Sequence, residues 1–398
     1  MMNTTTFPLI TALPNQRVQN PSTTALLPTA DAWAGGCFVL LLALGLLSNG
    51  SAWLHDQFAP ITSDWPSFMV GEPMQQLAHA LAKAELPVTA ARIERGLSWQ
   101  VSRDLGPRVR EGERDWLFLT DELTSHANAA LSAANRSQQV IELRQRLAAD
   151  GIKLLVVVVP DKSRIAAEHL GPLQRPAAFA ERVKQWTGPL AQAGVEVLDL
   201  SAALATLQRQ GEPAFLRTDS HWTEAGAETA AALVAQRIRA LVALGFVPPS
   251  AFRVRLKDRV TAVRPGDLVK LAGLDGLPSG WQPRPELAQQ SRFEMVRNAA
   301  VASAGKSGHT GHAGDAELFG DAELPSIALV GTSFSRNSNF VPFLEQKLHR
   351  QVGNFALDGG DFDGAARAYL RSPAFKQTPP KLLVWEIPER VLAVDIKG

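Results

Sequence analysis

Three residue types that together carry out acyl transfer stand in this 398-residue chain as Asp219, His221 and Ser333. A serine hydroxyl is a weak nucleophile until a nearby base takes its proton, and a histidine oriented by a carboxylate provides that base. Asp219 and His221 are two positions apart, so both side chains face the same side of an extended segment. We predict Ser333 as the nucleophile, His221 as its base and Asp219 as the acid that orients the base.

The predicted nucleophile follows a short apolar run. Residues 327–330 are typical of a buried strand, and the glycine after them places Ser333 at the carboxyl edge of a sheet. Its own backbone N–H and one from Gly359 or Gly360 are candidates for stabilising an oxyanion. Two structural alternatives stay open, since a serine after a strand is often a helix cap and paired glycines suit a plain tight turn.

Helical and strand patterns alternate around these residues. A helix over 137–150 and a valine-rich run over 152–159 are followed by a helix over about 177–193 and a strand over 195–198. The alternation predicts an α/β fold with a mostly parallel sheet and helices on both faces. The later elements of the pattern are a helix over 224–244, the strand that begins at 326, a helix near 338–349, a strand over 352–356, a helix to about 371 and a strand over 381–387.

The predicted catalytic domain spans 110–398 and follows a helical connecting region over 55–109. Residues 248–323 are interpreted as an insertion in this domain, and the stretch over about 302–322 is a low-complexity loop. The strand-like pieces that we expect in the insertion are 252–256 and 267–271.

The amino-terminal part has a different composition. Residues 1–31 are rich in Thr, Pro, Asn and Ala, which favours a disordered leader. Residues 32–54 carry no charge and are long enough to cross a bilayer as a helix, with Trp33 and Trp53 near the two interfaces. We predict an uncleaved transmembrane signal anchor with its amino terminus inside, and a cleavable signal peptide is the alternative. In either case the bulk of the chain is exported.

Charge and cysteine content narrow the classes of partner. Forty basic and 39 acidic residues give a formal net charge of +1, which argues against a nucleic-acid partner. The single cysteine, Cys37, excludes an intrachain disulfide and is interpreted as an apolar filler. His309 and His312 form a His-x-x-His pair, but they lie in the predicted loop without acids from a fixed element, so we predict no metal site.

Several residues near the predicted sheet edge are weaker candidates for a functional role. Trp222 is a candidate for stacking on a sugar ring, with packing beside the histidine as the alternative. Arg336 is a further candidate for substrate binding. Lys162 and Arg164 follow a buried strand and could hold an anionic sugar, although a structural ion pair is the favoured interpretation. The residues expected to form a structural network at the end of the sheet are Glu386, Glu389 and Arg390.

Five motifs extend this pattern over about 110–392. They are Gly112-Glu-Arg-Asp-Trp-Leu-Phe-Leu119, Pro160-Asp-Lys162, Asp219-Ser-His-Trp222, Gly331-Thr-Ser-Phe-Ser335 and Trp385-Glu-Ile-Pro-Glu-Arg390. In this order they resemble the alginate O-acetyltransferase family, the AlgJ- and AlgX-like proteins. The resemblance is closer to AlgJ-like members in two respects. The chain has the predicted amino-terminal anchor, and it lacks the carbohydrate-binding module that AlgX-like members carry.

The resemblance implies a fold, a reaction and partners. It implies an SGNH-hydrolase-like α/β domain, circularly permuted because the serine follows the Asp/His pair in the chain. It also implies that Ser333 carries an acetyl group and passes it to exopolysaccharide hydroxyls, with no cofactor. The implied setting is the periplasm beside the inner membrane, where a membrane-bound O-acyltransferase partner supplies acetyl groups.

Two other functions remain open. An acetylesterase would use the same three residues to remove acetyl groups from a polysaccharide. A non-catalytic scaffold of an export complex would hold the polymer or a partner protein, but the presence of Ser333, His221 and Asp219 counts against it.

Overall fold

The computed structural model describes residues 27–54, 65–242, 252–297 and 325–395. The chain divides into two compact units, Met1–Ala91 and Arg92–Gly398. The second unit holds all three predicted catalytic residues. The His309–His312 pair and the low-complexity loop predicted over about 302–322 lie outside the described residues.

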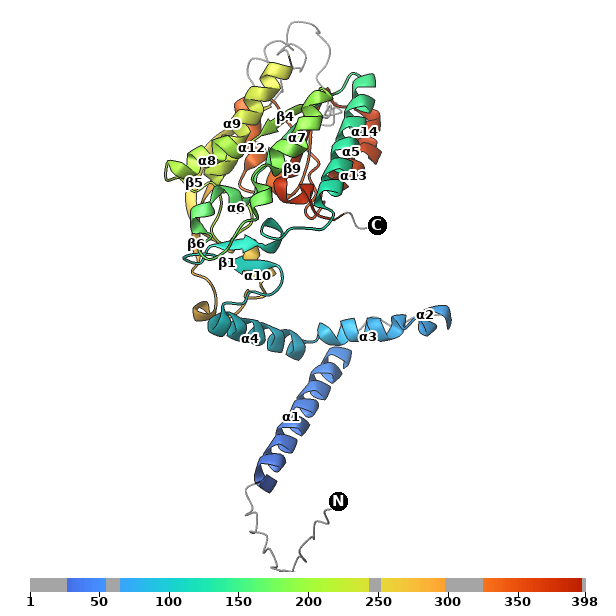
Figure 1. The fold of residues 1–398 in the computed structure, drawn as a ribbon, viewed down its shortest axis with the longest axis vertical. Coiled ribbons are helices and arrows are strands. Elements are labelled where there is room, and N and C mark those ends of the chain that lie inside the picture. Colours follow the sequence, from blue (N-terminus) through green and yellow to red (C-terminus); the bar gives the residue numbers. More distant parts are fainter. Residues whose placement is uncertain (1–26, 55–64, 243–251, 298–324, 396–398) are drawn as a thin grey trace, which may run out of the picture. The chain divides into compact units, whose positions relative to one another are not determined.

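A five-stranded parallel sheet forms the centre of the second unit (Figure 1). Its order is β4 (Glu196–Asp199), β3 (Lys153–Val159), β9 (Leu382–Pro388), β7 (Ile327–Val330) and β8 (Gly353–Asn354). All the strand pairs run parallel. Parallel strands place their carboxyl ends at one edge, so the ends of β7 and β9 lie side by side.

Helices cover both faces of this sheet, as predicted (Figure 1). Successive side chains of β3 alternate between two cores, with Leu155 and Val157 in one and Val156 and Val158 in the other. The first core packs against α8 (Ser201–Arg209), α9 (Glu224–Leu241) and α12 (Phe340–Leu348), and the second packs against α5 (Ala129–Ala149), α7 (Arg182–Gln192) and α13 (Gly364–Arg371).

Two antiparallel strand pairs accompany the central sheet. The short pair is β1 (Val109–Glu111) with β2 (Leu117–Leu119), and the residues between them form its turn. The long pair is β5 (Phe252–Arg264) with β6 (Glu286–Arg297), which lies in the segment predicted as an insertion. The piece expected at 252–256 is therefore the start of a much longer strand.

The prediction of a strand over 267–271 is wrong. Asp267–Leu271 forms the short helix α10. Leu268 is buried with Ala272 and Leu274, while Asp267 occupies the first helical turn, where a carboxylate is favoured by the helix dipole.

The first unit is helical. It contains α1 (Leu27–Leu54), α2 (Trp65–Met69), α3 (Glu72–Ala82) and the beginning of α4 (Glu85–Ser102). The helix α1 begins within the segment predicted as a disordered leader, and residues 1–26 of that segment lie outside the description.

The predicted membrane anchor is not supported. Among the residues that the structure describes, no helix combines the length and the apolarity that crossing a membrane requires. A span needs about 20 predominantly apolar residues. In the predicted segment the polar sequence Ser48-Asn-Gly-Ser51 interrupts the apolar residues between Leu47 and Trp53.

Candidate active site

The side chains of Ser333, His221 and Asp219 lie in one hydrogen-bonded line. The Ser333 Oγ is 2.7 Å from the His221 Nε2, and the His221 Nδ1 is 2.6 Å from the Asp219 Oδ1. An ionised carboxylate only accepts, so Nδ1 donates to Asp219 and Nε2 is left to accept from the serine hydroxyl. This is the arrangement that a nucleophile, its base and an orienting acid require.

The nucleophile turn, residues 331–335, is held by Glu386 from the neighbouring strand β9. Its carboxylate accepts from the Thr332 backbone N–H at 2.7 Å, from the Thr332 hydroxyl at 3.0 Å and from the Ser335 hydroxyl at 3.0 Å. Gly331 leaves room for this contact, because a Cβ there would lie 2.5 Å from the Glu386 Oε2. Glu386 is buried, and burial raises the pKa of its carboxyl. Of the residues expected to form a structural network at the end of the sheet, Glu386 therefore supports the turn that carries Ser333.

The carbonyl of Ser333 is also fixed. It accepts from the Arg336 backbone N–H at 3.1 Å, and from the backbone N–H and the side-chain amide of Asn337 at 3.0 and 2.9 Å. Three donors on one carbonyl leave the turn little freedom, so the direction of the serine side chain is set by the backbone around it.

The Asp219–His221 segment is a closed loop. An antiparallel bridge joins Phe215 to Trp222, and the Leu216 N–H donates to the His221 carbonyl at 3.0 Å. Trp222 is fully buried and its ring packs edge-on against Phe334, with centroids 5.1 Å apart. It has no exposed face for a sugar ring, so the packing interpretation holds and the stacking one does not.

Lys162 supports the same loop. Its buried ammonium donates to the carbonyls of Leu117, Arg217 and Asp219 at 2.6, 2.8 and 3.0 Å. It cannot reach a bound sugar from this position. Burial lowers the pKa of Lys162 to about 8. Arg164 lies instead in a buried cluster around Glu389, whose carboxylate also accepts from Arg175 and Arg182.

Two polar residues that sequence reasoning missed lie against the triad residues. The Arg264 Nε donates to the Asp219 Oδ2 at 3.1 Å, and its NH2 nitrogen donates to the Asn337 Oδ1 at 3.0 Å. The Asp267 Oδ2 is 3.5 Å from the His221 Nδ1 and accepts from the Ser220 hydroxyl. Both come from the segment 248–323 that was predicted as an insertion, since Arg264 ends β5 and Asp267 begins α10.

The pKa values of the two carboxyl groups beside His221 are shifted in opposite directions. Burial alone would raise the pKa of Asp219, but the hydrogen bond and charge of His221, together with Arg264, hold it far below its usual range. Burial and then the negative charge of Asp219 raise the pKa of Asp267. Asp219 is thus kept ionised as the partner of the imidazole.

Asp219, His221 and Asp267 each offer a ligand atom within 4.8 Å of the others, a spacing that could hold a metal ion. The 2.6 Å bond between Asp219 and the His221 Nδ1 already uses one atom from each. A metal ligand at Nδ1 would need that nitrogen without its proton. The geometry therefore favours the hydrogen-bonded chain over ion binding.

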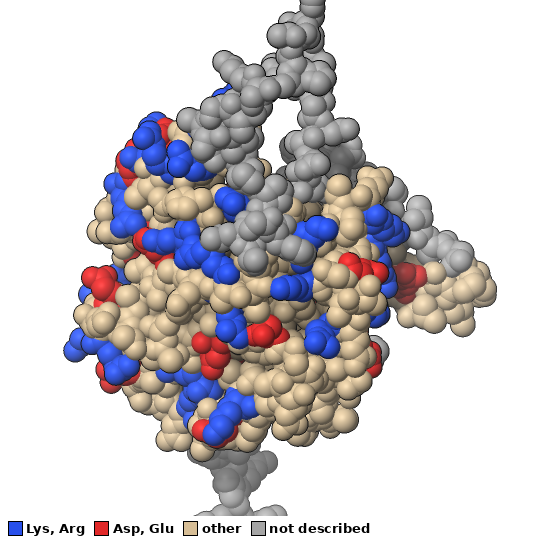
Figure 2. Space-filling model, turned by 90° about the horizontal axis from the view of Figure 1, so that it is seen from above, with Lys and Arg blue, Asp and Glu red and all other residues tan. Residues whose placement is uncertain are grey.

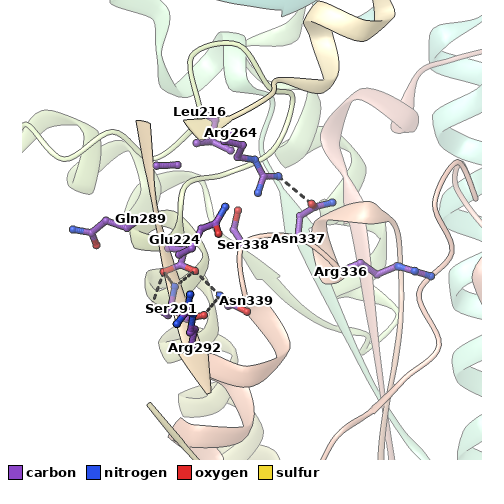
Figure 3. Close-up of a pocket in the computed structure, with 12 residues that line it drawn as sticks. Leu216, Glu224, Arg264, Gln289, Ser291, Arg292, Arg336, Asn337, Ser338 and Asn339 are labelled. Carbon is purple, nitrogen blue, oxygen red and sulfur yellow. Dashed lines mark hydrogen bonds between the residues drawn. The ribbon is translucent and has the colours of Figure 1, made fainter. Parts of the chain in front are cut away.

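A polar pocket of about 340 Å³ adjoins this site (Figure 3). Figure 3 shows the Arg264 guanidinium turned toward Asn337, with Glu224 held by Ser291 and Asn339 across the pocket. Arg336, the predicted substrate-binding candidate, also lines the pocket and is half exposed. It forms an ion pair with Asp358 at 3.4 Å.

The predicted oxyanion donors differ in their surroundings. The Gly360 N–H donates to the Leu357 carbonyl at 3.1 Å, so it closes a turn. Gly359 has a φ of 68°, a left-handed conformation that explains a glycine at this position. The Ser333 N–H comes directly after Thr332, which is held by Glu386. The tight-turn alternative thus accounts for both glycines.

Comparison with known proteins shows the family to which this chain belongs. A sequence model of the family described as "SGNH hydrolase-like domain, acetyltransferase AlgX" matches residues 109–389. The chain belongs to this family of SGNH-hydrolase-like acetyltransferases, which confirms the predicted resemblance.

Its relatives include AlgJ proteins. The "Probable alginate O-acetylase AlgJ" of Pseudomonas putida is 34% identical over 361 residues, covering 88% of this chain and 87% of the relative. The solved O-acetyltransferase domain of P. putida AlgJ has a TM-score of 0.59 at 30% identity and covers 73% of this chain and 94% of that one. The AlgX structure of Pseudomonas aeruginosa has a TM-score of 0.50 at 25% identity and is covered over 61% of its length.

Proposed function

We propose that this chain is an alginate O-acetyltransferase that carries the acetyl group on Ser333. The observation that carries the proposal is the unbroken hydrogen-bonded line from Ser333 through His221 to Asp219 in a family of acetyltransferases. The relatives named alginate O-acetylase, matched over most of their length, support alginate as the acceptor.

The reaction is a double displacement. His221 takes the hydroxyl proton of Ser333 at Nε2 while the serine oxygen attacks the acetyl carbonyl of the donor, and the same proton then leaves with the donor's alcohol or thiol. A polysaccharide hydroxyl next attacks the acetyl-serine and gives its proton to His221, which passes it to the departing Ser333 oxygen and so restores the serine. We place the Ser333 N–H at the oxyanion that forms in each step.

The polar pocket beside the nucleophile turn is the proposed site of the acceptor. It is lined by the side chains of Arg264, Arg292 and Arg336. A guanidinium matches the geometry of a carboxylate, and uronic-acid residues of alginate carry one carboxylate each. Arg336 is half exposed and Arg292 more so, which leaves both accessible to a polymer.

The setting of the reaction follows from the acceptor. We propose that acetylation takes place in the periplasm, because the polymer is an exported one, and that a membrane-bound O-acyltransferase partner delivers the acetyl group. The circular permutation of the SGNH-like domain is proposed on the same family resemblance, since the nucleophile follows its base in the chain.

The test combines an acetyl-ester donor with alginate. Wild type and Ser333→Ala are incubated with p-nitrophenyl acetate and unacetylated alginate, and both free acetate and polymer acetyl groups are measured. We expect polymer acetylation with wild type and a loss of at least a thousandfold with Ser333→Ala. Ser102→Ala, at an exposed position of α4 where the hydroxyl donates to the Ser98 carbonyl of the same helix, is the control and keeps its activity.

The two rival functions give different results in this assay. Serine-dependent acetate release without acetyl groups on the polymer identifies an acetylesterase. If neither product depends on Ser333, the proposed chemistry is wrong and a scaffold is the better description.

A further inference from the structure

Arg264 connects Asp219 to the turn that carries Ser333. It stands at the end of β5, outside the segments that hold the three triad residues. Its Nε donates to the free oxygen of Asp219 at 3.1 Å, and its NH2 nitrogen donates to the Asn337 side-chain oxygen at 3.0 Å. Asn337 in turn donates to the Ser333 carbonyl at 2.9 Å. One guanidinium thus joins the orienting acid to the nucleophile turn.

The bond geometry gives this contact a mechanical consequence. The Arg264 side chain is only 21% exposed, and a planar guanidinium with two partners fixes their separation and angle. Asp219 is bonded on one oxygen by His221 and on the other by Arg264, so its carboxylate cannot rotate without breaking a bond. The imidazole, which takes its orientation from Asp219, is therefore aligned with Ser333 through Arg264.

The charge of Arg264 has a second consequence for His221. The groups that favour a protonated imidazole are Asp219, at 2.6 Å from Nδ1, and Asp267, at 3.5 Å. Arg264 opposes them because it neutralises part of the charge of Asp219. Lys162 acts in the same sense through the Asp219 carbonyl, and Arg390 lies over the Phe334 ring that packs against His221. The hydroxyl of Ser333 is neutral.

We propose that Arg264 is a positioning residue of this site, which holds Asp219 and the nucleophile turn in one frame and, through its positive charge, opposes protonation of the imidazole that accepts the proton of Ser333. Its consequence for turnover rests on the proposed function. Its effect on the imidazole does not, so the two can be tested separately.

The first measurement is the protonation of His221 itself. NMR titration of labelled histidine side chains, with His221→Gln to identify the resonance, gives the midpoint of His221 protonation in each variant. Loss of the positive charge in Arg264→Gln is expected to raise this midpoint by about one pH unit. Arg264→Lys keeps the charge and is expected to stay within about 0.3 unit of wild type. Arg292→Gln removes an arginine from the same pocket without touching Asp219 or Asn337 and leaves the midpoint unchanged.

The second measurement is turnover of p-nitrophenyl acetate across pH. The acidic limb of the profile is expected to move to higher pH by about one unit in Arg264→Gln, because an imidazole that has lost a nearby positive charge stays protonated up to a higher pH. Arg264→Lys keeps the position of the limb but loses about tenfold in its plateau, since a single ammonium cannot hold both partners in the same plane.

The outcomes separate the proposal from its alternatives. A His221 midpoint that is the same in wild type and Arg264→Gln overturns the electrostatic half, and wild-type turnover in Arg264→Lys overturns the positioning half. If Arg264→Gln does not fold, as judged by circular dichroism, the Lys variant still decides the second point. If wild type turns over no ester, the proposed function fails, while the NMR midpoints still test Arg264.

Discussion

Two carboxylates approach the same ring nitrogen of His221 at different distances. Asp219 accepts its proton at 2.6 Å, whereas Asp267 lies at 3.5 Å and is engaged by the backbone N–H and hydroxyl of Ser220. The near carboxylate sets the tautomer and orientation of the ring. The far one contributes mainly charge, so substitutions at the two positions should have different kinetic signatures.

Asp267→Asn is expected to move the acidic limb of the pH–rate profile to lower pH by about half a unit. Removal of a negative charge near the imidazole makes its protonated form less stable, so the base becomes neutral at lower pH and the plateau changes little. Asp219→Asn is the contrasting variant, because it allows the wrong tautomer and is expected to lower the plateau by about a thousandfold or more. Ester turnover measured between pH 4 and 9 checks both, and a limb unmoved in Asp267→Asn would contradict the assigned role of its charge.

The approach of Ser333, His221 and Asp219 to one another could be predicted because two motifs, each weak alone, occur together in the sequence. Ser333 follows an apolar strand and a glycine, and Asp219 and His221 share a two-residue spacing. Arg264 and Asp267 carry no such signal. They reach the site only because β5 and α10 fold against the loop that carries Asp219. Arg264 and Asp219 are more than 40 positions apart in the chain, so no local pattern links them.

At the scale of elements, the nucleophile turn depends on the packing of β7 against β9. Gly331 lies at the end of β7, opposite Glu386, and the Glu386 carboxylate fills the space where a side chain would stand. Glu386 is buried on the neighbouring strand, so it cannot move away freely. The turn is therefore shaped by a close approach between two strands rather than by the turn sequence alone.

Gly331→Ala is expected to lower the free energy of unfolding by about 1–3 kcal/mol, because the added Cβ would lie 2.5 Å from the Glu386 Oε2. Ester turnover should fall at least tenfold as the bonds from Glu386 to Thr332 and Ser335 are displaced. Gly364→Ala, where a Cβ meets no atom within 4 Å, is the matched control and should be neutral. Thermal unfolding and turnover of the two variants provide the check, and equal effects in both would remove the steric explanation.

A second element contact depends on Lys162. Lys162→Met leaves three buried carbonyls without their donor and is expected to lower the free energy of unfolding by about 2–4 kcal/mol. Turnover should also fall, since one of these carbonyls belongs to Asp219. Lys184→Met, at an exposed position, is the control.

The same substitution predicts a pH dependence. Burial lowers the pKa of Lys162 to about 8 in the folded chain, while a lysine in an unfolded chain has a pKa of about 10.4. Between these values the unfolded state binds more protons, so the wild type gains stability with rising pH relative to Lys162→Met. Denaturant unfolding at pH 7, 8, 9 and 10 measures the difference, which should grow above pH 8. A constant difference would show that Lys162 does not titrate in this range.

Element prediction from the sequence worked where a segment had one clear period. The apolar run of β3 and the helix α9 were both predicted close to their observed bounds. The five residues of α10 are too few to show a helical period, and their apolar content resembles that of a strand. The strand β5 alternates basic and apolar residues over 253–257, but the charged pair Asp258 and Arg259 breaks this period of two where the register shifts, so the pattern does not reveal the full length of the strand.

At the scale of the whole molecule, the charges are mixed. Basic and acidic side chains are interspersed on the face shown in Figure 2, and the net charge is only +1. A field of this kind does little to steer a polyanion over long distances. Recognition of an acidic polymer would then depend on short-range contacts, which is why the arginines that line the pocket beside Ser333 matter more than the total charge.

The boundary of the catalytic unit offers the last prediction. The family match begins at residue 109, whereas the compact unit begins at Arg92. Between these positions Trp99 is buried with Leu105 against Leu268 of α10, and its Nε1 donates to Glu111 at 2.8 Å. Because α10 also carries Asp267, loss of this packing should affect both stability and the site.

A chain of residues 92–398 is therefore expected to retain the unfolding temperature of this unit and its ester turnover, whereas a chain of residues 109–398 should lose both. Trp99→Ala in the full chain separates the contribution of packing from that of chain length, with an expected loss of about 3–5 kcal/mol. The exposed Trp65 of the first unit provides the control substitution Trp65→Ala. Near-UV circular dichroism during thermal unfolding and turnover of p-nitrophenyl acetate measure each chain. If 109–398 matches 92–398 in both, α10 holds Asp267 in place without support from Trp99.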